Sequence, residues 1–170
     1  MAKALLEEID NRYRTIRSRG ARAVAGLSMG GYAAIKSALK YSDSYIVAGS
    51  LSGALHVGGD LDKREQQYRD RILRVFGPES SPSRSENNVF DLLDKANPPL
   101  LPYLYLACGI EDRFLDTNRQ LAQQLSERKI AYEFHETSGA HDWDYRDRSL
   151  RGVLPVIADK LSLVTTTPSP

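Results

Sequence analysis

The run Gly26-Leu27-Ser28-Met29-Gly30 has the pattern GxSxG and stands between two segments of different character. Before it, Arg22 to Gly26 is a short apolar run typical of a strand, and the residues from Gly30 to Leu39 are rich in helix formers. Glycines on both sides of Ser28 let the backbone turn sharply and raise the serine hydroxyl above the end of a sheet. The sequence therefore predicts a strand, a tight turn and a helix.

Three further segments have the composition and alternation of strands, and helical patterns separate them. These segments are Tyr45 to Ser50, Tyr103 to Cys108, and Ala131 to Glu136. Strands that alternate with helices need right-handed crossovers, which produce a parallel sheet. We therefore expect an α/β fold, with a parallel sheet of about four strands and helices on both of its faces.

Helical spacing of apolar residues is clearest in three places. It opens the chain from about Lys3 to Arg17, it recurs on a face formed by Phe114, Asn118, Leu121, Ala122 and Leu125, and it ends in a helix from Leu150 to Leu161. Pro155 should kink or interrupt that last helix. Residues 57–102, with a charged helical stretch over 63–76, form an excursion from the sheet. We expect one domain over residues 1–164 and a disordered tail over 165–170.

Composition excludes several classes of protein. The chain of 170 residues is 41% hydrophobic and 26% charged, and its formal net charge of +1 is spread without a basic stripe, so we expect no nucleic-acid or membrane partner. Cys108 is the only cysteine, which excludes an intrachain disulfide and a CxxC site. The first residues lack an apolar signal core, and no run approaches the roughly 18 apolar residues of a membrane span. We expect a cytoplasmic protein, although the parent compartment stays open.

A serine hydroxyl becomes a useful nucleophile only beside a base, and the chain has three histidines. His135 lies within the fourth strand and should face solvent, and His56 lies in a loop after the second strand. His141 follows the fourth strand, in a loop at the carboxyl end where open α/β sheets place their sites. His141 is therefore the best candidate for the base that activates Ser28. At the start of the helix after Ser28, the Met29 N–H can stabilise a developing oxyanion.

A carboxylate should hold the second imidazole nitrogen. Asp112 is the best candidate because it lies in the loop that leaves the third strand, next to the strand that delivers His141. Glu111 and Asp116 are neighbouring acids that could be mistaken for it, whereas Asp142 is too close to His141 in sequence.

Four stretches together are similar to one family: Ala25 to Ala34, Ser50 to Leu55, Cys108 to Asp112, and Gly139 to Trp143. They resemble the esterase D or "putative esterase" branch of the α/β hydrolases, which includes S-formylglutathione hydrolases, feruloyl and acetylxylan esterases and, more distantly, mycolyltransferases. The resemblance implies a triad of Ser28, Asp112 and His141, the order of α/β-hydrolase triads, with Met29 donating to the oxyanion.

The resemblance fails at the amino end. The family's sheet has about eight strands, and no segment here matches the early loop that supplies a second oxyanion donor. A natural short enzyme, a fragment, and a chain completed by a partner or a second copy all fit. The strand from Arg22 to Gly26 then lacks a neighbour on one side, which favours a homodimer through that edge.

The function expected from these residues is a serine carboxylesterase that hydrolyses short-chain or carbohydrate-linked acyl esters through an acyl-enzyme, with no metal and no organic cofactor. The alternatives are a thioesterase of the S-formylglutathione hydrolase type and a non-catalytic or partner-completed module. Trp143, Tyr32 and Ser52 could line the substrate pocket, although packing roles explain them equally well.

Overall fold

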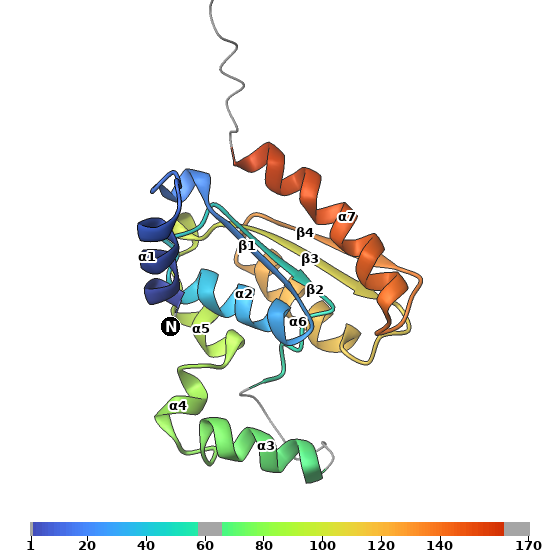
Figure 1. Ribbon diagram of the computed structural model, residues 1–170. Helices are drawn as coiled ribbons and strands as arrows, with labels where there is room; N and C mark the ends of the chain where they lie inside the picture. Colours follow the sequence, from blue (N-terminus) through green and yellow to red (C-terminus); the bar gives the residue numbers. More distant parts are fainter. Residues whose placement is uncertain (1, 58–65, 162–170) are drawn as a thin grey trace, which may run out of the picture.

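The structure is a computed structural model that describes residues 2–57 and 66–161 (Figure 1). The tail expected over 165–170 lies outside the described residues. The elements, in chain order, are α1 (Ala2–Arg12), β1 (Ala23–Leu27), α2 (Met29–Lys40), β2 (Val47–Leu51), α3 (Gln66–Phe76), α4 (Pro82–Ser85), α5 (Val89–Lys95), β3 (Tyr103–Gly109), α6 (Leu115–Glu127), β4 (Tyr132–Thr137) and α7 (Trp143–Lys160).

The four strands form one parallel sheet in the order β1-β2-β3-β4. In its register, Gly26 lies opposite Ser50, Ser50 opposite Leu106, and Leu106 opposite Phe134. Helices α2 and α6 cover one face and α7 covers the other (Figure 1). The predicted α/β fold with four parallel strands is therefore confirmed. The carboxyl ends of all four strands lie at the same end of the sheet, where a shared site can form.

The two central strands divide their side chains between two apolar clusters, as the twofold periodicity of a strand requires. Leu104, Leu106 and Cys108 of β3 face a large core that α2 and α6 cover. Tyr105 and Ala107 alternate with them and pack with Val153 of α7 on the opposite face. Strands β2 and β3 are buried almost throughout, which explains their nearly continuous apolar sequence.

The expected boundaries of the last helix are wrong. Helix α7 begins at Trp143, because the Asp142 side chain caps its first turn by accepting the Tyr145 N–H at 2.8 Å. It then runs through Pro155 without ending. Pro155 and Arg151 are both exposed, so water can satisfy the carbonyl group that a proline leaves without its helical partner.

The first helix is also shorter than expected, since α1 ends at Arg12. The chain then folds back on it: Thr15 Oγ1 donates to Asp10 Oδ1 at 2.7 Å, and a short 3-10 turn at Arg19–Ala21 leads into β1. The charged stretch forms α3, although its expected first residues, 63–65, lie outside the described part. No helix within residues 2–57 and 66–161 is long and apolar enough to cross a membrane.

Candidate active site

Ser28 occupies the turn between β1 and α2, with φ 55° and ψ −115°. A non-glycine residue at positive φ is strained, and the surrounding backbone holds it there. The Ser28 N–H donates to Leu51 O at 2.9 Å, and Ser28 O accepts the N–H groups of Tyr32 and Ala54 at 3.1 Å each. The neighbouring strand β2, the loop after it and helix α2 therefore hold the backbone of Ser28 and fix the direction of its side chain.

The sharp turn needs a glycine at position 26. A Cβ on Gly26 would lie 2.4 Å from the Gly30 carbonyl carbon, a separation that real side chains do not reach. Gly30 has no such constraint, because nothing lies within 4 Å of the Cβ position there. Of the two motif glycines, the first permits the close approach of β1 and α2.

The structure brings together the three residues that the sequence singled out. His141 Nε2 lies 3.0 Å from Ser28 Oγ, and His141 Nδ1 lies 2.8 Å from Asp112 Oδ2. Both distances are those of hydrogen bonds. The imidazole thus bridges an alcohol and a carboxylate, and the two ring nitrogens have different partners, which selects one tautomer.

Asp112 is deeply buried in the loop after β3, with its side chain inaccessible to solvent. Its second oxygen, Oδ1, accepts the Phe114 N–H at 3.0 Å, so the carboxylate is hydrogen-bonded on both oxygens. The Phe114 ring meets the His141 ring edge-on, with centroids 5.0 Å apart. Phe114 therefore contacts His141 directly, and the sequence pattern did not show this contact because Phe114 also fitted the face of the following helix.

The other two histidines have different environments. His135 is exposed on β4, as expected, and its Nε2 lies 2.8 Å from Glu133 Oε2. His56 is buried, and its ring packs against that of Phe114, with the two centroids 5.2 Å apart. Phe114 thus connects His56 to His141, although only His141 bonds to Ser28.

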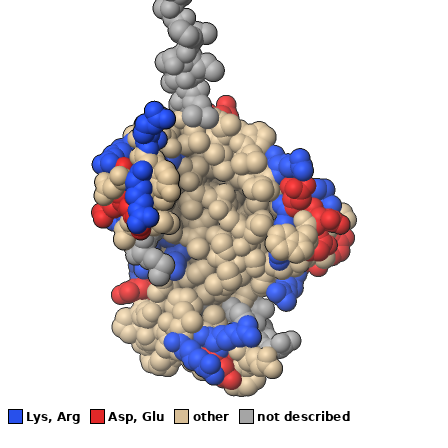
Figure 2. Space-filling model, in the orientation of Figure 1, with Lys and Arg blue, Asp and Glu red and all other residues tan. Residues whose placement is uncertain are grey.

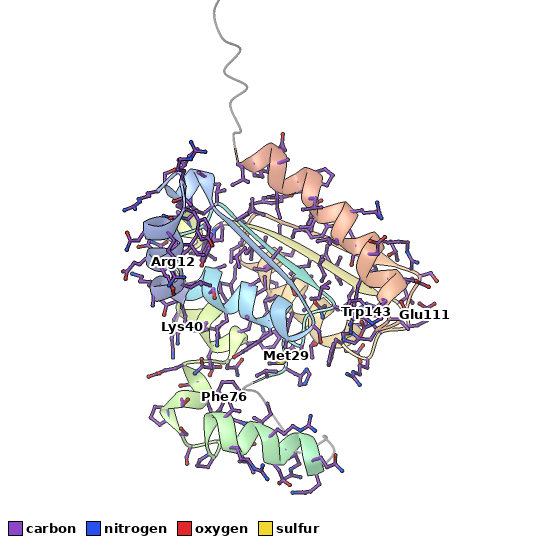
Figure 3. All side chains as sticks on the ribbon, viewed as in Figure 1. Arg12, Met29, Lys40, Phe76, Glu111 and Trp143 are labelled. Carbon is purple, nitrogen blue, oxygen red and sulfur yellow. The ribbon has the colours of Figure 1, made fainter. Side chains whose placement is uncertain are left out.

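Met29 is the first residue of α2, where a backbone N–H has no acceptor within the helix. The positive end of the helix dipole lies at the same place. Figure 3 shows Met29, Trp143 and Glu111 toward the end of the sheet where the strands finish, with Arg12 and Lys40 on the far side. This end of the sheet can accept a developing negative charge beside Ser28.

The three residues considered for substrate contact differ in accessibility. Trp143 is 75% exposed at the start of α7, with the Arg146 guanidinium 4.9 Å from its ring centroid. Tyr32 is 2% exposed and its hydroxyl donates to Asn87 O at 2.7 Å, and Ser52 is 1% exposed. These placements favour packing for Tyr32 and Ser52 and leave Trp143 available to a ligand.

Cys108 and Tyr145 lie beneath the site and stay protonated. Burial, assisted by the Asp112 carboxylate, raises the pKa of the Cys108 thiol to about 12. Burial likewise raises the pKa of Tyr145 to about 12. Within the described ranges, 2–57 and 66–161, no cluster of three or more histidine, cysteine and acidic side chains could hold a metal ion.

A parallel α/β sheet whose strand ends carry a serine at a strained turn, hydrogen-bonded through a histidine to an aspartate, defines the α/β hydrolase class. Within that class, residues 1–156 match the family model described as "Putative esterase". The chain belongs to this esterase family, as the sequence resemblance predicted.

Individual relatives agree with this assignment. An acetyl esterase from Caldicellulosiruptor saccharolyticus is 34% identical over 132 residues, which cover 72% of this chain and 48% of that protein. Among solved structures, an S-formylglutathione hydrolase from Staphylococcus aureus superposes with a TM-score of 0.77 at 26% identity, over 91% of this chain and 61% of that one. A fluorophosphonate-binding serine hydrolase from the same organism gives a TM-score of 0.77 at 27% identity, over 92% and 61%. The chain thus spans only about half to three fifths of the length of these relatives.

Proposed function

We propose that this chain is a serine carboxylesterase that hydrolyses short-chain or carbohydrate-linked acyl esters. The observation that carries the proposal is the continuous hydrogen-bonded series Ser28 Oγ, His141 Nε2, His141 Nδ1 and Asp112 Oδ2, with links of 3.0 and 2.8 Å. Membership of the esterase family supports the same reaction. The acetyl esterase relative favours a small acyl group.

In the first half of the proposed reaction, Ser28 Oγ attacks the ester carbonyl carbon while His141 Nε2 takes the hydroxyl proton. The carbonyl oxygen becomes an oxyanion, which the Met29 N–H stabilises. Asp112 stabilises the imidazolium that forms. The ester C–O bond then breaks, and His141 returns the proton to the departing alcohol.

In the second half, a water molecule gives a proton to His141 and attacks the acyl-enzyme carbonyl. Collapse of that intermediate releases the carboxylic acid and returns the proton to Ser28 Oγ. Trp143 is the proposed contact for the acyl or alcohol group, because it is exposed and stands two residues after His141.

The test is hydrolysis of 4-nitrophenyl acetate by the purified chain, compared with Ser28→Ala. We expect a rapid release of nitrophenol equivalent to the enzyme concentration and a loss of at least about 1000-fold in the variant. A fluorophosphonate probe should label the wild-type chain on Ser28 alone. Equal hydrolysis by both proteins would instead favour a non-catalytic module.

A thioesterase is the second candidate, and the S-formylglutathione hydrolase neighbour is the specific observation in its favour. The two candidates share the acyl-enzyme and differ in the leaving group. Comparing kcat/KM for an acetyl ester with that for a glutathione thioester decides between them. A preference of more than tenfold for the thioester, about 1.4 kcal/mol, would overturn the carboxylesterase proposal.

We further propose that two copies associate through the edge of β1. Ala25 is exposed on this strand, and a groove of about 520 Å³ runs beside it, lined in part by Leu5, Val24 and Tyr41. Figure 2 shows that the face between α1 and α7 carries no charged side chains near its centre. An uncharged strand edge beside a mainly apolar groove, to whose lining Lys36 and Lys40 also contribute, is a surface for pairing with another strand.

A twofold axis at this edge pairs β1 with the β1 of a second copy in antiparallel orientation. The two four-stranded sheets then form one continuous sheet. Sedimentation should give a dimer for the wild type and a monomer for Ala25→Lys. The matched control, Ala131→Lys, places the same charge next to β4 at the opposite edge and should stay dimeric. A monomeric wild type at micromolar concentration would contradict the proposal.

A further inference from the structure

Two loops meet where Asp112 and His141 bond, and Glu111 connects them. The Glu111 carboxylate Oε2 accepts the Gly139 N–H at 2.5 Å, while the Glu111 N–H donates to Gly139 O at 3.2 Å. Ser138 Oγ donates to the other carboxylate oxygen at 3.4 Å. One residue of the loop after β3 thus holds both backbone polar groups of a residue in the loop after β4.

The contact between these loops is made by backbone. A Cβ on Gly109 would lie 1.9 Å from Gly139 O, so the approach requires glycine at position 109. Gly139 has φ 145°, a conformation that side chains rarely adopt, and its own Cβ would lie 2.5 Å from the Tyr145 ring. From α7, Arg148 Nη2 donates to Ser138 O at 3.0 Å. The loop after β4 is therefore held between β3 and α7.

We infer that Glu111 is a positioning residue, whose carboxylate holds the loop of His141 against the loop of Asp112 and so maintains the 2.8 Å bond between them. Glu111 directly precedes Asp112, and Gly139 stands two residues before His141. A displacement near 1 Å in such a bond costs on the order of 100-fold in rate. The kinetic consequence rests on the proposed esterase function, whereas the geometric role does not.

The competing explanation is that the negative charge of Glu111, rather than its hydrogen bonds, stabilises the His141 imidazolium. Glu111→Gln separates the two, since glutamine has nearly the same shape and keeps one oxygen that can accept the Gly139 N–H, but carries no charge. Glu111→Ala removes the charge and the acceptor together. Glu127→Ala is the matched control, because Glu127 is also exposed and hydrogen-bonded to a side chain, Gln123, but lies on α6.

In ester hydrolysis, we expect Glu111→Ala to lower kcat by about 10- to 100-fold with little change in KM. The acidic limb of its kcat profile should move to lower pH, because a poorly held Asp112 stabilises the protonated imidazole less. Glu111→Gln should recover kcat to within about threefold and restore the limb. Glu127→Ala should match the wild type. A glutamine variant as impaired as the alanine variant would overturn the positioning role in favour of charge.

A readout without turnover keeps the inference separate from the esterase proposal. The His141 Nδ1 proton, held by Asp112, should give a far-downfield proton NMR signal in the wild type and in Glu111→Gln, and the signal should be lost in Glu111→Ala. Persistence of the signal in the alanine variant would refute the role of Glu111. Absence of Ser28-dependent hydrolysis would refute only the esterase proposal.

Discussion

The residue directly beneath the site, Cys108, has the chemistry of a core side chain. It is fully buried on β3, and burial together with the Asp112 carboxylate raises the pKa of its thiol to about 12. Thiolate, not thiol, is the reactive form of cysteine. The same aspartate that holds His141 therefore disfavours ionisation of the only cysteine in the chain.

We predict that Cys108 in the folded chain does not react with Ellman's reagent over an hour at pH 8. In guanidinium chloride, one equivalent should react within minutes, because unfolding exposes the thiol and returns its pKa to the ordinary range. The absorbance of the released thiolate measures both. Rapid reaction of the native chain would mean that the loop between β3 and α6 opens readily.

A single polar side chain also connects separate elements. Asn118 of α6 is fully buried, and its Nδ2 donates to Gly53 O and to Phe114 O at 2.9 Å each. It thereby joins the loop after β2 to the start of α6. We predict that Asn118→Ala lowers the free energy of unfolding by about 1–3 kcal/mol, because it leaves a buried carbonyl without its donor. Urea unfolding measures this change, and an unchanged midpoint would contradict the prediction.

At the scale of elements, the turn between β1 and α2 provides a comparison between two glycines of one motif. Gly26→Ala forces a methyl group into the Gly30 backbone and should destabilise the fold by about 3 kcal/mol or more. Gly30→Ala meets no atom within 4 Å and should be neutral or up to about 1 kcal/mol stabilising, since alanine is the better helix former. Urea unfolding of both variants tests the pair, and comparable destabilisation would contradict the geometry.

The elements that depend on local pattern could be predicted. Strand β3 was expected at Tyr103 to Cys108 and is observed at Tyr103–Gly109, because a continuous β-prone run between turn residues has few alternatives. The start of α7 was missed. Asp142, which caps the helix, is followed closely by a second acidic residue, Asp144, and the sequence alone does not show which of the two is the cap. Pro155 does not end the helix, because the cost of a proline in a helix depends on exposure.

The site could be predicted in outline from chain order, since Ser28, Asp112 and His141 each follow a strand and parallel strands bring their ends together. Their catalytic roles stay predictions. Contacts made between loops, such as Glu111 with Gly139, depend on the path of the backbone and leave no spacing that a sequence pattern can detect. The burial of Tyr32 could likewise not be predicted, because the GxSxG pattern constrains only the first turn of the following helix.

At the scale of the whole molecule, both faces of the sheet are covered but its edges differ. Strand β1 is apolar and the groove beside it is mainly apolar, with Lys36 and Lys40 in its lining, whereas β4 carries Glu133, His135 and Glu136, which blunt that edge. Arg119 pairs with Glu136 through two contacts of 2.9 and 2.6 Å at the β4 side. This asymmetry is the reason to expect association through β1 and not β4. The single-domain boundary at residue 164 stays a prediction.

Two buried side chains that stay protonated make the free energy of unfolding depend on pH in the alkaline range. Cys108 and Tyr145 have pKa values raised to about 12, from ordinary values of 9.0 and 10.0. The unfolded chain loses these protons first, so their contribution to stability is complete below about pH 9 and is lost as pH rises toward 12. Lys36 acts in the opposite direction, because burial and Lys40 lower its pKa.

We therefore predict that the free energy of unfolding in urea falls between pH 9 and pH 11 and that Cys108→Ala makes this fall shallower. A single proton changes the free energy of unfolding by at most about 1.4 kcal/mol per pH unit, so the thiol contributes at most about 2.7 kcal/mol to the fall over these two pH units. Tyr145→Phe should also make the fall shallower, while Tyr45, Tyr103 and Tyr105, whose pKa values burial also raises, keep part of it. If both variants lose stability over this range as steeply as the wild type, the buried protons beneath the site are not what makes the fold sensitive to base.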